Sequence, residues 1–146
     1  MRIIGAWLLC DDGAIRPTLR AKSLREDGTL AADVFLLDTG ADRTVFSAAF
    51  LEDLGLPAHD SSPDYSLVGI SGNSPFVLVE TALEFSHDDG GVVRVRGEFA
   101  AFSDPTATDM SVLGRDVLNN FDVILSRRRN EVLLLAPNHQ YRVEKS

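Results

Sequence analysis

Apolar residues recur along the chain in short runs, several of which alternate apolar with polar positions, and Gly, Asp, Asn and Pro separate the runs. This pattern is typical of β-strands joined by tight turns. We interpret residues 3–10 as the first strand, because the run is too short for a secretion signal or a membrane span. Further strands are predicted at residues 18–24, 30–37, 65–69, 76–85, 92–102, 111–113, 122–125 and 132–135.

The polar segments between these runs predict hairpins. Asp27-Gly28 lies between residues 18–24 and 30–37, and an Asp-Gly pair between two apolar runs is a strong hairpin signal. Two further hairpin loops and a turn are predicted at residues 70–75, 126–131 and 87–91. The sequence therefore indicates a mainly β protein in which hairpins join several pairs of consecutive strands.

Two short helices interrupt the strands. Ser47 can cap a helix that runs to Leu54, with Gly55 as its stop. A second helix is predicted at residues 116–121. Five aromatic residues are expected in the core: Phe46, Phe50, Phe85, Phe99 and Phe121.

Composition adds limits to this picture. The chain has 146 residues, which fits a single domain over residues 1–146, and no linker or low-complexity tract divides it. Its net charge of −8 argues against nucleic acid and against an anionic membrane surface as partners. Cys10 is the only cysteine, which excludes an intrachain disulfide and favours a reducing, cytoplasmic location.

Candidate chemistry lies at the end of the apolar run 34–37, where Asp38-Thr39-Gly40-Ala41 follows. An aspartate at the end of a buried strand, followed by a small hydroxyl residue and a glycine, is one way to hold an acid catalyst on a tight turn. Gly40 permits backbone angles that a side chain would forbid. Taken alone, these residue types also form ordinary turns.

A second segment, residues 111–119, changes that balance because it pairs a short apolar strand with Gly114-Arg115-Asp116 and the start of a helix. Together with residues 36–45, it resembles the retropepsin-like aspartic proteases, the group of retroviral and single-lobe bacterial peptidases. The likeness runs from about Pro17 to about Leu135. It implies an all-β, single-lobe barrel with one or two short helices, active as a symmetric homodimer on peptide or protein substrates.

The resemblance also implies roles for individual residues. Asp38 would be the catalytic acid, Thr39 would brace the two active-site loops across the dimer axis, and Gly40 would offer its carbonyl to the substrate. Arg115 would pair with Asp42 and, with Gly114, support the loop. The positions implied to contact substrate, including the flap residues 68–72, are Ala41, Asp42, Arg43, Val45, Val68, Gly69, Ile70, Ser71, Gly72 and Val112.

Peptide hydrolysis of this kind needs two neighbouring carboxyl groups that share one proton, because like charges in contact cannot both ionise. The chain offers one credible Asp-Thr-Gly. Asp11 lies in residues 8–14, which loosely resemble residues 36–41. It is interpreted as a turn residue, because the Asp-Gly pair that follows it is typical of turns. We therefore expect the second carboxylate to come from a second copy of the chain. Compared with the compact viral enzymes of the family that it resembles, the chain has extra residues at both ends. The resemblance therefore leaves open how the termini build the dimer.

Several features of the sequence also allow a function other than proteolysis. The same fold could serve as a dimerisation or peptide-binding module without proteolysis. The arginine run 127–129 is interpreted as a solvated hairpin tip, with a basic docking patch as the alternative. Gly69-Ile70-Ser71-Gly72 fits an RNA-binding loop poorly, given the acidic balance. No cofactor or metal is expected. The three histidines, His59, His87 and His139, lack metal-ligand spacing and are interpreted as surface residues.

Overall fold

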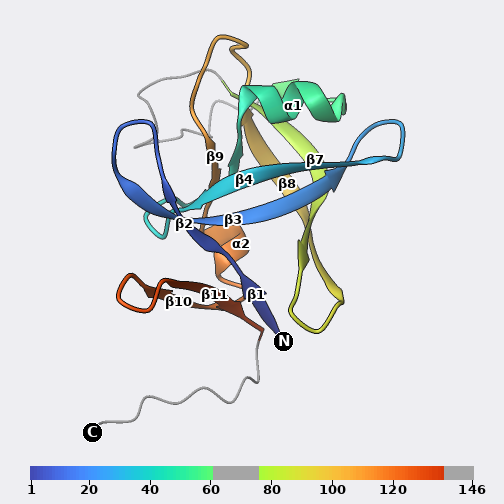
Figure 1. The fold of residues 1–146 in the computed structure, drawn as a ribbon. Helices are drawn as coiled ribbons and strands as arrows, with labels where there is room; N and C mark the ends of the chain where they lie inside the picture. Colours follow the sequence, from blue (N-terminus) through green and yellow to red (C-terminus); the bar gives the residue numbers. More distant parts are fainter. Residues whose placement is uncertain (61–75, 137–146) are drawn as a thin grey trace, which may run out of the picture.

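A computed structural model describes residues 1–60 and 76–136 and shows a mostly β protein with two short helices (Figure 1). Most strands belong to one large sheet, and six of them form a closed ring because β3 pairs with both β4 and β7. In ring order these strands are β3 (Ile15–Leu24), β4 (Leu30–Leu37), β9 (Ser111–Leu113), β5 (Val45–Phe46), β8 (Val92–Phe102) and β7 (Phe76–Ser86). The expected single-lobe barrel is confirmed.

Two short strands extend the sheet beyond the ring. β2 (Ala6–Leu9) pairs with β3, and β6 (His59–Asp60) pairs with β7, both antiparallel. A separate small sheet has the order β1 (Arg2–Ile4), β11 (Glu131–Leu135) and β10 (Asp122–Ser126). Figure 1 shows this small sheet below the barrel, beneath α2. The predicted hairpin formed by residues 122–125 and 132–135 is therefore present.

The interpretation of residues 3–10 as one strand is wrong, because the chain changes sheets at Gly5. β1 belongs to the small sheet and β2 to the large one. The Gly5 amide donates a hydrogen bond to the Val132 carbonyl at 2.8 Å. A Cβ at position 5 would lie 2.2 Å from the Thr18 carbonyl oxygen, so only glycine allows the two backbones to cross this closely.

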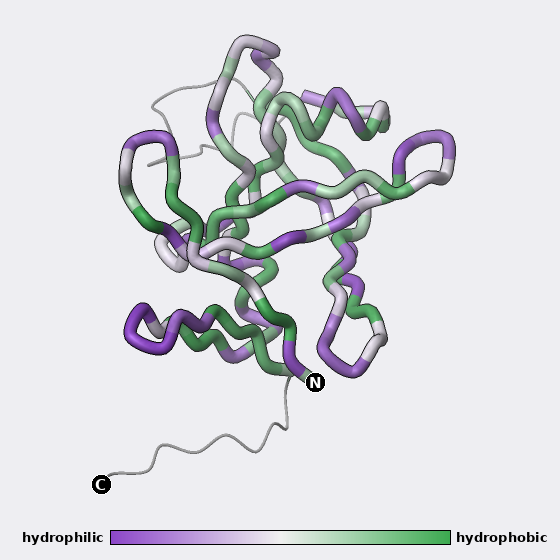
Figure 2. Tube along the Cα trace, in the orientation of Figure 1, coloured by the Kyte–Doolittle hydropathy of each residue, from purple (hydrophilic) through white to green (hydrophobic). Residues whose placement is uncertain are grey.

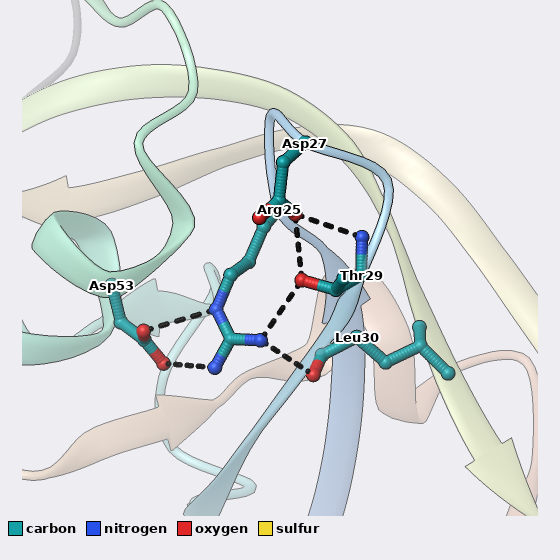
Figure 3. Close-up of polar contacts among 5 residues, drawn as sticks. All are labelled: Arg25, Asp27, Thr29, Leu30 and Asp53. Atoms are coloured by element: carbon teal, nitrogen blue, oxygen red, sulfur yellow. Dashed lines mark hydrogen bonds and ion pairs between the residues drawn. The ribbon is translucent and has the colours of Figure 1, made fainter.

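The predicted Asp27-Gly28 hairpin is confirmed and is tied to a helix (Figure 3). Gly28 has a positive φ of 87°, which glycine adopts without strain. The Arg25 guanidinium donates to both carboxylate oxygens of Asp53 at 3.1 and 3.3 Å, and to the Thr29 hydroxyl at 3.1 Å. Arg25 thereby joins the turn between β3 and β4 to the helix that carries Asp53.

That helix, α1 (Ala48–Leu54), begins and ends where the sequence predicts. The Ser47 hydroxyl accepts a hydrogen bond from the Phe50 amide at 3.1 Å, and Gly55 ends the helix with a φ of 63°. The second helix, α2 (Arg115–Leu118), starts one residue earlier and ends sooner than residues 116–121. Within the described residues, neither helix is long and apolar enough to cross a membrane.

A cluster of aromatic rings fills the barrel. Phe46 lies 5.1 to 5.8 Å from the ring centroids of Phe35, Phe50 and Phe99. Phe85 contacts Phe121 at 6.3 Å. Four of the predicted core phenylalanines are therefore buried in the main apolar cluster, and Phe121 is partly buried and packs against it. The predicted strand 65–69 lies outside the described residues.

We predict that Gly5→Ala lowers the free energy of unfolding by about 1–3 kcal/mol, because the added methyl group collides with a neighbouring backbone carbonyl. Urea denaturation measures the change. Gly97→Ala is the matched control, since its Cβ would meet only side-chain atoms at 3.5 Å or more. Equal effects of the two substitutions would contradict the close crossing at Gly5.

Candidate active site

The loop that follows β4 holds Asp38 by its own backbone. β4 runs parallel to β9, and the Asp38 amide donates to the Leu113 carbonyl at 3.1 Å. The Gly40 amide donates to the Asp38 carboxylate at 2.9 Å, and the Ala41 amide donates to the Asp38 carbonyl at 3.2 Å. Asp38, Thr39 and Gly40 are all exposed in the single chain. The tight turn thus presents a fixed carboxylate at the surface.

A buried threonine ties this loop to α2. The Thr44 side chain is fully buried, and its hydroxyl donates to an Asp116 carboxylate oxygen at 2.7 Å. The Thr44 amide donates to both oxygens of the same carboxylate at 3.0 Å. The Thr44 hydroxyl in turn accepts from the Gly114 amide at 3.0 Å. Bonds to a charged acceptor are stronger than neutral ones, so this is the firmest polar link of the loop.

Backbone bonds continue the same link. The Arg115 amide donates to the Ala41 carbonyl at 2.8 Å, and the Asp116 amide donates to the Asp42 carbonyl at 3.2 Å. Gly114 lies so close to the loop that a Cβ there would be 2.4 Å from the Arg43 carbonyl carbon. The Gly-Arg-Asp motif therefore needs glycine to let the two segments touch.

The predicted ion pair between Asp42 and Arg115 is present. Both side chains are exposed, with 81% and 49% of their surfaces accessible. Exposed pairs contribute about 0–1 kcal/mol. The pair is therefore weaker than the neighbouring contacts of Asp116. Sequence reasoning missed the positioning roles of Thr44 and Asp116, although both residues lie within the two segments that it singled out, 36–45 and 111–119.

The other residues predicted to contact substrate lie in different settings. Arg43 and Val112 are half-buried, and Ala41 is buried. Val45 is fully buried in a small apolar cluster with Ala48, Leu78, Ala100 and Phe102. β5 lies between β8 and β9, and the role of Val45 in lining a substrate pocket stays a prediction. Val68, Gly69, Ile70, Ser71 and Gly72 lie outside the described residues.

Within residues 1–60 and 76–136, the one grouping of metal-ligand side chains is His87, Asp88 and Asp89, in the turn between β7 and β8. Arg2 already binds the Asp88 carboxylate through its backbone amide and side chain at 2.9 and 2.8 Å. The interpretation of His87 as a surface residue is wrong, since 13% of its side chain is exposed. A Cβ at Gly91 would lie 2.3 Å from its ring, so the turn folds against it.

Residues 26–117 match the profile of the aspartyl protease family. The chain belongs to this family. The matched segment includes the Asp38 loop, Thr44 and the Gly114-Arg115-Asp116 motif. No curated protein matches the sequence of the chain significantly.

Solved structures show the same retropepsin-like fold. A retropepsin-like aspartic protease from Rickettsia conorii aligns with a TM-score of 0.56 and 15% identity, over 92% of this chain and 90% of that one. The EIAV protease, solved in complex with the inhibitor HBY-793, aligns with a TM-score of 0.50 and 22% identity, over 71% of this chain and 86% of that one. At these identities the likeness establishes the fold.

We predict that Thr44→Val destabilises the protein by about 1–3 kcal/mol, because it leaves the buried Gly114 amide without its acceptor and removes a bond to Asp116. Thermal or urea unfolding measures the loss. Thr44→Ser keeps the hydroxyl and should retain most of the stability. A serine variant as unstable as the valine variant would show that the hydroxyl is not what holds the loop.

Proposed function

We propose that the protein is an aspartic endopeptidase that works as a homodimer, with Asp38 of each copy facing the other across a two-fold axis. The observation that carries the proposal is the Asp38 carboxylate itself, exposed at the end of β4 and fixed by a loop clamped to α2. Membership of the aspartyl protease family supports the same chemistry.

The proposed reaction uses two carboxyl groups that hold one proton. The ionised group takes a proton from a water molecule, whose oxygen attacks the peptide carbonyl carbon. The protonated group donates to the carbonyl oxygen, which becomes a hydroxyl of the tetrahedral intermediate. The group that took the proton from water then donates it to the nitrogen as the carbon–nitrogen bond breaks, and one hydroxyl returns its proton to the other carboxylate, giving a carboxylic acid and an amine.

The need for a second copy follows from how the nearby acids are used. Asp116 already accepts bonds from Thr44 with both carboxylate oxygens, and Asp42 pairs with Arg115. Neither the Asp116 nor the Asp42 carboxylate is therefore placed as the second acid of the site. A symmetric dimer supplies an identical carboxylate without requiring a second motif in the chain.

Further roles belong to the same proposal. Gly40 would accept a hydrogen bond from an extended substrate, which would lie as an added strand, and Thr39 would brace the paired loops. Residues 68–72 would cover the substrate and exclude water. Asp42, Arg43 and Val112 would contact its side chains. The half-buried Cys10 fits a reducing, cytoplasmic location, which stays a prediction.

We predict that Asp38→Asn abolishes peptide cleavage, with a loss of at least about 100-fold, because the amide cannot exchange the proton. Cleavage of an unbiased peptide library at mildly acidic pH, read by mass spectrometry, measures the loss. Glu52→Gln makes the same carboxylate-to-amide change at an exposed position of α1 and should leave cleavage unchanged. A wild-type protein that binds peptides but cleaves none would instead favour a peptide-binding module.

We also predict that specific activity falls on dilution, because the active species is a dimer governed by mass action. Activity and sedimentation should be measured over the same range of protein concentration. The protein concentration at which half of the specific activity is lost should equal the concentration at which half of the dimer has dissociated. Constant specific activity from a species that sediments as a monomer would contradict the proposal.

A further inference from the structure

The hairpin formed by β2 and β3 projects past the end of the barrel that carries Asp38. Thr18 of β3 lies opposite Leu36 of β4, and β3 begins three residues before Thr18, at Ile15. Asp38 lies two residues beyond Leu36 toward the same end of the sheet. At about 3.3 Å per residue, the hairpin reaches at least as far as Asp38 in that direction. It therefore flanks the candidate active-site loop.

An apolar pair is exposed on this projecting part. Leu9 and Ile15 are cross-strand partners and so share one face of the hairpin. Their exposed fractions are 67% and 46%, and the neighbouring Leu8 is 40% exposed. Figure 2 shows hydrophobic colouring on both arms of the hairpin next to its hydrophilic tip. An apolar surface of this kind beside a proposed active site indicates a contact with another protein surface.

The tip of this hairpin is acidic and ordered. It carries Asp11 and Asp12, and the Asp12 carboxylate accepts two hydrogen bonds from the Arg16 guanidinium at 2.8 and 2.6 Å. These bonds hold the pKa of the Asp12 carboxyl well below its usual range. The Asp12 carboxylate therefore stays ionised at mildly acidic pH, paired with Arg16, and Asp11 is the second acid of the tip.

A basic turn lies on the same side of the molecule. Arg127, Arg128 and Arg129 form the turn between β10 and β11, and all three are exposed. Arg127 lies over the ring of Trp7 in β2 at 5.2 Å, and the Trp7 indole donates to the Ser126 and Glu131 carbonyls at 3.2 and 3.1 Å. In Figure 1 the loop after β4 lies between this turn and the tip of the hairpin, at the left.

We propose that the β2–β3 hairpin and the arginine turn form the surface on which a second copy of this chain docks. The inference rests on the proposed homodimer and specifies which residues build it. In a two-fold interface, a residue away from the axis contacts a different residue of the mate, and the reverse contact is also made, so groups of opposite charge at two such positions attract each other twice. The acidic tip and the arginine turn supply groups of opposite charge, and Leu9 and Ile15 supply exposed apolar area next to the tip.

The test compares two exposed apolar pairs at opposite ends of β3. The variant Leu9→Ser with Ile15→Thr removes the pair beside Asp38. The control variant Leu24→Ser with Leu30→Thr removes a cross-strand pair of similar exposure, 48% and 47%, at the far end of the β3–β4 hairpin. Sedimentation equilibrium gives the dimer dissociation constant, and thermal unfolding checks that each chain folds.

We expect the dissociation constant to rise at least about tenfold for the Leu9/Ile15 variant, since both copies lose apolar contacts, and to stay near the wild-type value for the control. Asp38-dependent activity should fall in parallel and recover at high protein concentration. An active wild-type dimer whose dissociation constant responds equally to both variants would overturn this interface but leave the proposed function intact. A wild type that is monomeric at every concentration would overturn both.

Amide hydrogen exchange tests the same surface in the unmodified protein, whether or not the variants fold. Exchange is compared at concentrations above and below the dissociation constant. Residues 8–16 and 126–131 should exchange more slowly in the dimer, while residues 24–30 should exchange at the same rate in both states. Unchanged exchange at residues 8–16 while the protein passes from monomer to dimer would place the interface elsewhere.

Discussion

The geometry of the candidate site depends on one contact of a buried side chain, the bond between the Thr44 hydroxyl and the Asp116 carboxylate. This contact joins the loop after β4 to the start of α2, two segments far apart in sequence. Because the Thr44 hydroxyl also accepts from the Gly114 amide, one side chain satisfies a buried donor and fixes a charged acceptor. Gly114 makes the approach possible, since a side chain there would collide with the backbone of Arg43.

The consequence for function is a preorganised carboxylate. Asp38 accepts a bond from the Gly40 amide, and its own amide is held by Leu113 of the neighbouring strand. A loop fixed on both sides places the same carboxylate at the same position in each copy. Two copies related by a two-fold axis can then bring two equivalent acids together, which is the arrangement that shares one proton.

Local signals in the sequence predicted much of the fold. The Asp-Gly turn, the Ser47 cap and the Gly55 stop each depend on neighbouring residues, so they could be recognised without a structure. The division of residues 3–10 at Gly5 could not, because it depends on the distant Thr18 and Val132 backbones. The burial of Val45 also depends on two strands far along the chain.

The same distinction applies to the site. The motifs pointed to Asp38 and Gly114-Arg115 as candidate site residues, and the segment that matches the aspartyl protease family includes both. The stronger contacts of Thr44 and Asp116 were missed because threonine and aspartate are ordinary residues until the fold brings them together. The exposed hairpin beside Asp38 likewise emerges only from the register of β2, β3 and β4.

Subunit mixing tests the central claim most directly. Wild-type protein and Asp38→Asn protein are mixed in equal amounts at a fixed total concentration well above the dissociation constant, and allowed to exchange. If each active site needs an Asp38 from both copies, random pairing leaves about one quarter of the activity of pure wild type at that total concentration. A value of about one half would show that each chain works independently, and would contradict a shared site.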